Sequence, residues 1–160
     1  MSPATVADPV AIEEVFARVP LLAHLSDRQR SRMASLATTR LYDEGSIIVK
    51  QGDTSMALYV VLSGRATIDR ESEAGKSVRV DEVEHGGFFG EMGLIEDLPR
   101  AATVTAEEPT ECALLAKWDF QNELRTDPDI ALALLPVLGA RIRELDEVPD
   151  EIPLCRLAAG

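Results

Sequence analysis

The sequence has few aromatic residues and a clear deficit of positive charge. Aromatic residues make up only 4% of the 160 residues, so aliphatic side chains must supply most of a hydrophobic core. Lys and Arg number 16 against 28 Asp and Glu, which gives a net charge of −12. Nucleic acids and anionic membrane surfaces are bound mainly through clustered Lys and Arg. We therefore expect neither partner, and any anionic ligand would need a local positive site.

Long apolar runs, histidines and cysteines are scarce as well. No run approaches the ~20 residues of a membrane span, and no secretory leader is recognisable, so we expect a cytoplasmic protein. Cys112 lies in an apolar run and is expected to be buried, whereas Cys155 is near the C-terminus and nothing supports a disulfide between them. His24 and His85 are the only histidines, too few for the metal site of a cupin-type enzyme. We predict no catalytic residue, no metal ligand and no cofactor.

Helical patterns stand at both ends of the chain. Residues 1–11 are expected to form a disordered start, and Ser26 with Gln29 forms a capping box for an early helix. A short helix is expected at Asp119–Arg125, and a longer one after Asp127 that Pro136 should kink or split. The longer helix carries an apolar stripe formed by Leu134, Leu135, Leu138, Ile142 and Leu145. Residues 147–160 are expected to be an acidic tail.

Between the helices, short runs of β-branched and aliphatic residues alternate with glycines. The expected strands are Ser46–Lys50, Ala57–Leu62, Arg65–Glu71, Ser77–Glu82, Ala102–Ala106 and Glu111–Ala116. Strands at this spacing indicate an antiparallel sandwich or barrel. The fold class is therefore mainly β, an antiparallel roll or jelly roll of about eight strands with N-terminal and C-terminal helices, in one domain over residues 12–146.

The stretch FFGEMGLIEDLPRAATV, residues 88–104, places two charged residues among small ones. Glu91 lies between Gly90 and Gly93, which allow a tight turn and a close approach of ligand to backbone. An ionised carboxylate only accepts hydrogen bonds and suits a hydroxyl donor. Arg100 offers planar, bidentate donors that suit a phosphate. A carboxylate for a hydroxyl and a guanidinium for a phosphate together indicate a sugar phosphate.

This stretch closely resembles the phosphate-binding cassette of cyclic nucleotide-binding domains, found in protein kinase A regulatory subunits, the catabolite activator protein and cyclic nucleotide-gated channels. The upstream stretch YDEGSIIVKQGDTSMALYVVLSG is similar to that family's first strands. The resemblance implies that Glu91 accepts from the ribose 2′-hydroxyl and that Arg100 binds the cyclic phosphate. It implies supporting contacts at Gly90, Met92, Ala101 and Ala102.

The same resemblance carries expectations about the base. In the family a Thr or Ser directly after the arginine favours cGMP, and Ala101 at that position makes cAMP the expected ligand. Val80 and Val83 occupy positions that resemble those lining the base pocket. A side chain of the last helix, Ile142 or Leu145, would cover the base.

The expected function is therefore a non-enzymatic, cAMP-responsive regulatory module that signals through its C-terminal helices to an unidentified effector. The last helix is a candidate surface for a homodimer. The catabolite-activator branch continues into a DNA-binding helix-turn-helix, which this sequence does not contain, so a stand-alone module is expected unless the chain is a fragment of such a regulator. A scaffold that keeps the fold without binding a nucleotide is the other alternative.

Overall fold

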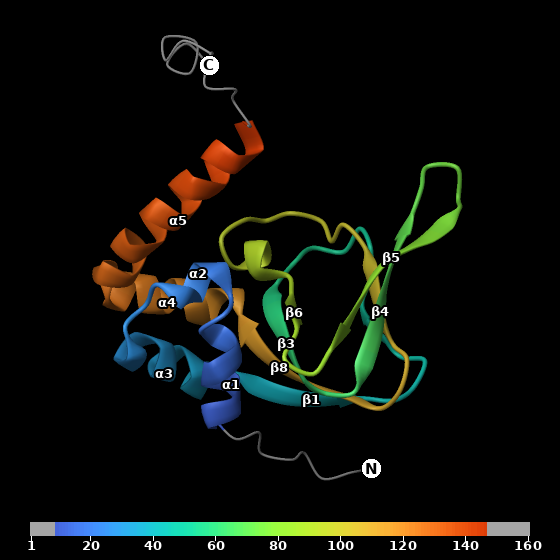
Figure 1. Cartoon of the computed structure of the whole chain (residues 1–160), viewed down its shortest axis with the longest axis horizontal. Coiled ribbons are helices and arrows are strands. Elements are labelled where there is room, and N and C mark those ends of the chain that lie inside the picture. The colour runs from blue at the N-terminus through green and yellow to red at the C-terminus, as the bar shows by residue number, and fades with distance from the viewer. Residues whose placement is uncertain (1–8, 147–160) are drawn as a thin grey trace.

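The computed structural model describes residues 9–146 and shows a β-roll with helices gathered along one side (Figure 1). Three helices come first: α1 (Pro9–Phe16), α2 (Pro20–Ala23) and α3 (Asp27–Leu36). The strands follow as β1 (Thr38–Tyr42), β2 (Ile47–Val49), β3 (Ala57–Ser63), β4 (Arg65–Glu71), β5 (Ser77–Glu84), β6 (Phe88–Phe89), β7 (Thr103–Ala106) and β8 (Thr110–Ala116). A 3-10 helix, η1 (Glu91–Leu94), separates β6 from β7, and α4 (Lys117–Thr126) and α5 (Pro128–Asp146) complete the described chain.

The eight strands form two four-stranded antiparallel sheets, which confirms the predicted fold class. One sheet has the order β1-β8-β3-β6 and the other β2-β7-β4-β5. Apolar side chains from both sheets meet between them, among them Val61, Ala66, Val83, Val104 and Cys112. The sparse aromatic content is sufficient because this interior is built mainly of aliphatic side chains.

Strands β3 and β8 are buried on both faces. Successive side chains of a strand point to opposite faces, so Val61 and Cys112 enter the space between the sheets. Leu58 and Leu115 face the other way and pack in a second core with the helices. This arrangement explains why both strands read as nearly continuous apolar runs, and it ties the helical layer directly to the roll.

The N-terminal helices follow the local signals closely. Ser26 Oγ accepts from the backbone N–H of Gln29 (3.1 Å), and the Gln29 side chain accepts from the N–H of Ser26 (2.9 Å), so the predicted capping box is confirmed. Helix α1 begins at Pro9, so residues 9–11 are helical although they were expected within a disordered start. The rest of that segment and the expected tail at 147–160 lie outside the described residues. Within residues 9–146, none of the helices combines the length and the apolar character that a membrane crossing requires.

Helix α5 continues through Pro136 as one element, so of the two expected outcomes, a kink or a split, the split does not occur. The proline removes one backbone donor, but the turn that loses it carries exposed side chains at Leu132 and Leu135, so water can reach the freed carbonyl. The apolar stripe of α5 divides between two environments. Leu134 is 4% exposed and belongs to the helical core, whereas Ile142 and Leu145 are 61% and 86% exposed.

Candidate functional site

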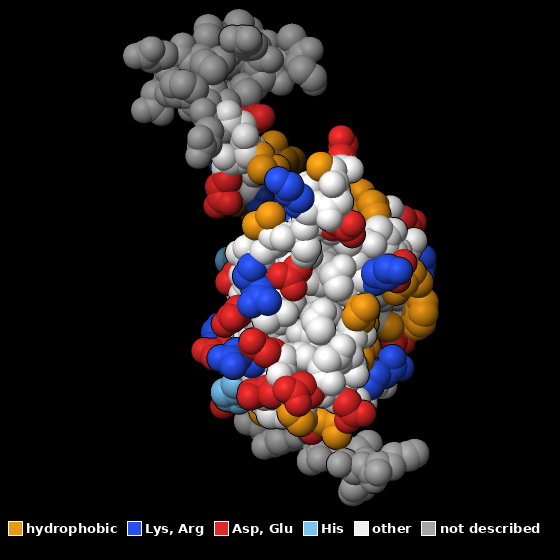
Figure 2. Space-filling view, turned by 90° about the vertical axis from the view of Figure 1, so that its right-hand side faces the viewer, with side chains coloured by type: hydrophobic (Ala, Val, Ile, Leu, Met, Phe, Trp, Pro, Cys, Tyr) orange, Lys and Arg blue, Asp and Glu red, His pale blue; other side chains and the backbone are white. Residues whose placement is uncertain are grey.

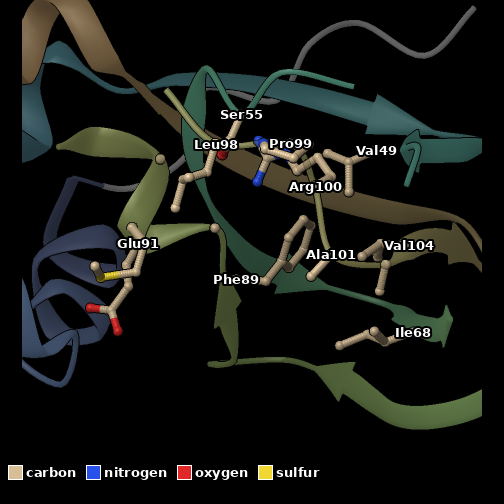
Figure 3. A pocket seen from close by; sticks show the side chains of 14 residues that line it. Val49, Ser55, Ile68, Phe89, Glu91, Leu98, Pro99, Arg100, Ala101 and Val104 are labelled. Atoms are coloured by element: carbon tan, nitrogen blue, oxygen red, sulfur yellow. The ribbon is translucent and has the colours of Figure 1, made fainter. Parts of the chain in front are cut away.

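A pocket of about 350 Å³ opens beside the segment that carries both predicted charges. The segment from Phe89 to Gly93 contributes one part of the lining, and Leu98 to Ala102 contributes another. Apolar side chains complete it from other strands: Val49, Ile68 and Val104. In Figure 3 Arg100 lies between Glu91 on one side and this apolar wall on the other. The structure therefore brings Gly90, Glu91, Met92, Arg100, Ala101 and Ala102 to one cavity.

The guanidinium of Arg100 lies over one aromatic ring and forms no ion pair with a described residue. Its Nη2 donates to the carbonyl of Ala57 (3.1 Å), and its Cζ lies 5.4 Å from the centre of the Tyr59 ring. Tyr59 in turn stacks on Phe89 with ring centres 5.0 Å apart. Burial lowers the pKa of Arg100, yet a guanidinium stays protonated in proteins. Within residues 9–146, no carboxylate pairs with this cation, so it retains its capacity to bind an anion.

Gly90 is required by the position of Arg100. Its backbone has φ +83°, a conformation that L-residues other than glycine rarely adopt. A Cβ atom added there would lie 2.2 Å from Nη1 of Arg100 and 2.9 Å from the carbonyl oxygen of Ala57. Any side chain at this position would therefore displace the guanidinium from its place in the pocket.

One of the two carboxylate oxygens of Glu91 already accepts a hydrogen bond from another element. Its Oε1 accepts from Nη2 of Arg141 on α5, and the Arg141 guanidinium also contacts the sulfur of Met92 (3.4 Å). The other oxygen, Oε2, is buried and accepts no hydrogen bond within the described residues. An unsatisfied buried acceptor costs about 1–3 kcal/mol. Glu91 therefore retains an acceptor that a ligand hydroxyl could satisfy.

Backbone hydrogen bonds fix the chain around Arg100 to the loop that precedes β3. The N–H of Arg100 donates to the carbonyl of Asp53 (2.7 Å), and its own carbonyl accepts from the N–H of Gly52 (2.9 Å). The N–H of Ser55 donates to the carbonyl of Leu98 (2.9 Å). These bonds hold the main chain, so the Arg100 side chain projects from a fixed base.

Two predicted base contacts lie elsewhere. Val80 is 58% exposed on β5, and Val83 is buried between the sheets; neither lines this pocket. Residues 77–82 of the edge strand β5 are all exposed, and Val80 has no partner on β4 because the β4–β5 register shifts between Ile68 and Asp69. The two proposed base covers, Ile142 and Leu145, are exposed on α5 and do not line the pocket either.

Sequence reasoning missed several lining residues. Ser55 is 5% exposed and lies against Gly93, where an added Cβ would come within 1.9 Å of its hydroxyl oxygen. Val49 and Ile68 were expected only as strand residues, and Arg141 only as part of the last helix. The spacing of small residues marked the segment 88–104, but no local signal links residues so distant in sequence.

Comparisons with known proteins agree with this geometry. The model of the cyclic nucleotide-binding domain matches residues 39–127, more than half of the chain. The chain belongs to the cyclic nucleotide-binding domain family. The N-terminal domain of a transcriptional regulator from Streptomyces coelicolor superimposes with a TM-score of 0.76 at 29% identity, covering 86% of this chain and 99% of that one.

Two curated relatives define the neighbourhood within the family. A cAMP-dependent protein kinase regulatory subunit from Yarrowia lipolytica is 36% identical over 106 residues, which are 66% of this chain and 28% of the relative. A cyclic AMP receptor protein from Thermus thermophilus is 34% identical over 127 residues, 79% of this chain and 59% of the relative. The chain thus spans only part of the length of either relative.

Proposed function

We propose that the pocket binds a cyclic nucleotide, with cAMP preferred, and that the chain acts as a non-catalytic regulatory module. The observation that carries the proposal is that two residues lining one pocket each keep unused hydrogen-bonding capacity. Arg100 is a partly buried cation without a carboxylate partner among the described residues, and Glu91 Oε2 is a buried acceptor without a donor among them. A cyclic phosphate and a ribose hydroxyl would satisfy both at once.

The preference for cAMP is supported by the chemistry beside Arg100. Ala101 and Ala102 follow the arginine and offer no side-chain hydroxyl to a guanine amino group. The apolar wall of Val49, Ile68 and Val104 suits the face of a purine and supplies no polar atom from a side chain. The two curated relatives are named for cAMP, which points the same way.

A scaffold that keeps the fold without a ligand is a weaker alternative. Such a protein has no reason to retain a partly buried arginine without a carboxylate partner and a buried carboxylate oxygen without a donor among the described residues, because each costs stability. Both residues are present here, and both line the same pocket. We assign no catalytic step to this pocket.

We propose that ligand binding is communicated to the effector through α5. Arg141 joins this helix to Glu91, the residue that would bind the ribose. A ligand that satisfies Oε2 changes the electrostatic surroundings of the same carboxylate that holds Arg141, so the position of α5 becomes sensitive to occupancy. Exposed apolar side chains on the outer part of α5 support a second proposal, a homodimer through this helix. The effector is undefined, and the cytoplasmic location stays a prediction.

Thermal unfolding with added nucleotide tests the proposed function. A ligand at 100 times its Kd should stabilise the native state by about 2.7 kcal/mol, and we expect a larger rise in Tm with cAMP than with cGMP at equal concentration. Arg100→Ala should weaken binding about 100-fold or more, because charge-assisted hydrogen bonds contribute about 1.5–3 kcal/mol each.

The matched control is Arg125→Ala, which removes an exposed arginine at the end of α4. It should bind as the wild type does. Failure of millimolar cAMP and cGMP to raise the Tm of the wild type would overturn the proposed function. Unchanged affinity in Arg100→Ala would place the phosphate elsewhere.

A further inference from the structure

Two side chains of α4 contact the loop formed by residues 94–100, which ends at Arg100. Lys117 and Gln121 are four residues apart and so lie on one face of the helix. Lys117 Nζ donates to the carboxylate of Asp97, and Gln121 Nε2 donates to the carbonyl of Leu94 (3.3 Å). The loop is therefore attached to α4 at its start and at its middle.

The Lys117 ammonium group is unusually enclosed for its type. Its side chain is 10% exposed, whereas that of Asp97 is 83% exposed. Lysine is rarely buried unless it is paired, and a buried charge left without its partner is costly. The backbone N–H of Lys117 also donates to the carbonyl of Met56 (2.9 Å), which fixes the start of α4. Lys117 is thus held in place, and the ion pair forms only when the loop places Asp97 beside it.

The rest of loop 94–100 is held from the opposite side. Leu98 and Arg100 are bonded through their backbones to Ser55, Asp53 and Gly52. Ile95 and Glu96 bond only back to the carbonyl of Met92. Asp97 lies between these two sets of bonds, so its ion pair with Lys117 is the tertiary contact that closes the gap, three residues before Arg100.

We propose that Lys117, assisted by Gln121, is a positioning residue that holds loop 94–100 in the conformation that presents Arg100 to its ligand. The inference rests on the proposed function where it concerns affinity. Its structural half does not, because the ion pair joins two residues of the chain itself. Binding at Arg100 is then felt at the start of α4, and through α4 by α5, which packs against it.

Hydrogen exchange on the nucleotide-free protein tests the structural half. Lys117→Met keeps the length of the side chain and removes its charge, and Asp97→Asn removes the partner at an exposed position that a folded protein tolerates. Both should speed exchange of the amides of residues 95–101 and leave those of β8 unchanged. Lys76→Met, an exposed lysine next to β5, is the matched control and should change neither. Unchanged exchange at 95–101 in both variants overturns the proposal.

Binding measurements test the functional half. We expect Lys117→Met to raise the Kd for cAMP about fivefold, which corresponds to about 1 kcal/mol, and Lys117→Arg to recover most of the loss. In the Asp97→Asn background Lys117→Met should have little further effect, because the pair is already broken. Additive losses, or a Kd equal to that of the wild type in Lys117→Met, would refute a role in positioning.

The only tryptophan of the sequence, Trp118, is adjacent to Lys117 and 61% exposed, so it reports on the start of α4. Its emission should change when cAMP binds the wild type, and this change should shrink in Lys117→Met at saturating nucleotide. An equal change in both proteins would contradict coupling through the ion pair. If the wild type binds no cyclic nucleotide, the proposed function fails while the exchange result still decides the structural half.

Discussion

Glu91 and Arg100 each keep hydrogen-bonding capacity that residues 9–146 do not use. Arg100 rests on the Ala57 carbonyl and the Tyr59 ring, contacts that orient it without neutralising it. Glu91 gives one oxygen to Arg141 and leaves the other buried and unsatisfied. At the scale of residues, a bound nucleotide would use the free hydrogen-bonding capacity of both side chains. The contribution of each side chain can be tested by a separate substitution.

Glu91→Gln tests the ribose contact. The amide keeps the shape of the carboxylate and removes its charge, so the affinity for cAMP should fall about tenfold or more, since hydrogen bonds to charged groups contribute about 1.5–3 kcal/mol. The wild type should bind 2′-deoxy-cAMP with a similar loss, and the variant should discriminate the two nucleotides less strongly in titration calorimetry. Glu96→Gln, an exposed neighbour, is the control. Full discrimination by Glu91→Gln would show that the hydroxyl is bound by another group.

At the scale of elements, successive parts of α5 lie in three different environments. Ile130 and Leu134 bury it in the helical core, Arg141 attaches it to the ligand segment, and Ile142 and Leu145 remain exposed. The outer part of α5 is therefore the part that is proposed to respond to the pocket.

Arg141→Gln should uncouple α5 from the pocket. The Arg141 side chain is 33% exposed, and partly exposed ion pairs contribute about 0.2–1 kcal/mol, so the affinity for cAMP should fall about fivefold at most. A dye attached at Leu145→Cys in a Cys155→Ser background should respond to cAMP in the parent protein and not in the Arg141→Gln variant. Arg143→Gln, two residues along the same helix, should preserve the response. A dye signal that survives Arg141→Gln would mean that the output takes another route.

At the scale of the whole molecule, charged and apolar side chains are mixed on the surface of the roll. Figure 2 shows acidic and basic side chains interspersed on the face of the roll, and among the described residues drawn there no continuous basic surface is visible. The exposed apolar residues of α5 behave differently: Leu135, Leu138, Ile142 and Leu145 recur at alternating intervals of three and four. This is the spacing of a two-helix seam, and three of the four are at least 61% exposed.

Sedimentation equilibrium tests the proposed dimer. We expect the wild type to self-associate and Ile142→Glu to remain monomeric, because a charge in the centre of an apolar seam must be desolvated. Leu132→Glu is the matched control, since Leu132 is also 61% exposed on α5 but lies outside the seam. A wild type that stays monomeric at high protein concentration, or equal effects of the two changes, would exclude this interface.

The sequence by itself determined the order of most elements and pointed to the segment 88–104, which lines the pocket. The capping box at Ser26, the glycines around Glu91 and the strand alternation are local signals whose physics acts within a few residues. It did not reveal β1, whose short polar pattern is defined by pairing with β8, or β6, two residues long and defined by pairing with Tyr59 and Val60.

Only the tertiary structure decided what surrounds the two charges. Val49 and Ile68 reach the pocket because β2 and β4 flank β7 in one sheet, and Ser55 reaches it from the loop before β3. Arg141 reaches Glu91 from α5, which packs against α4. Val80 likewise lies at the surface, because β5 is an edge strand whose residues 77–82 are all exposed, and alternation alone could not predict this. Contacts between residues dozens of positions apart depend on how whole elements pack, and that packing is decided by the collective burial of both cores.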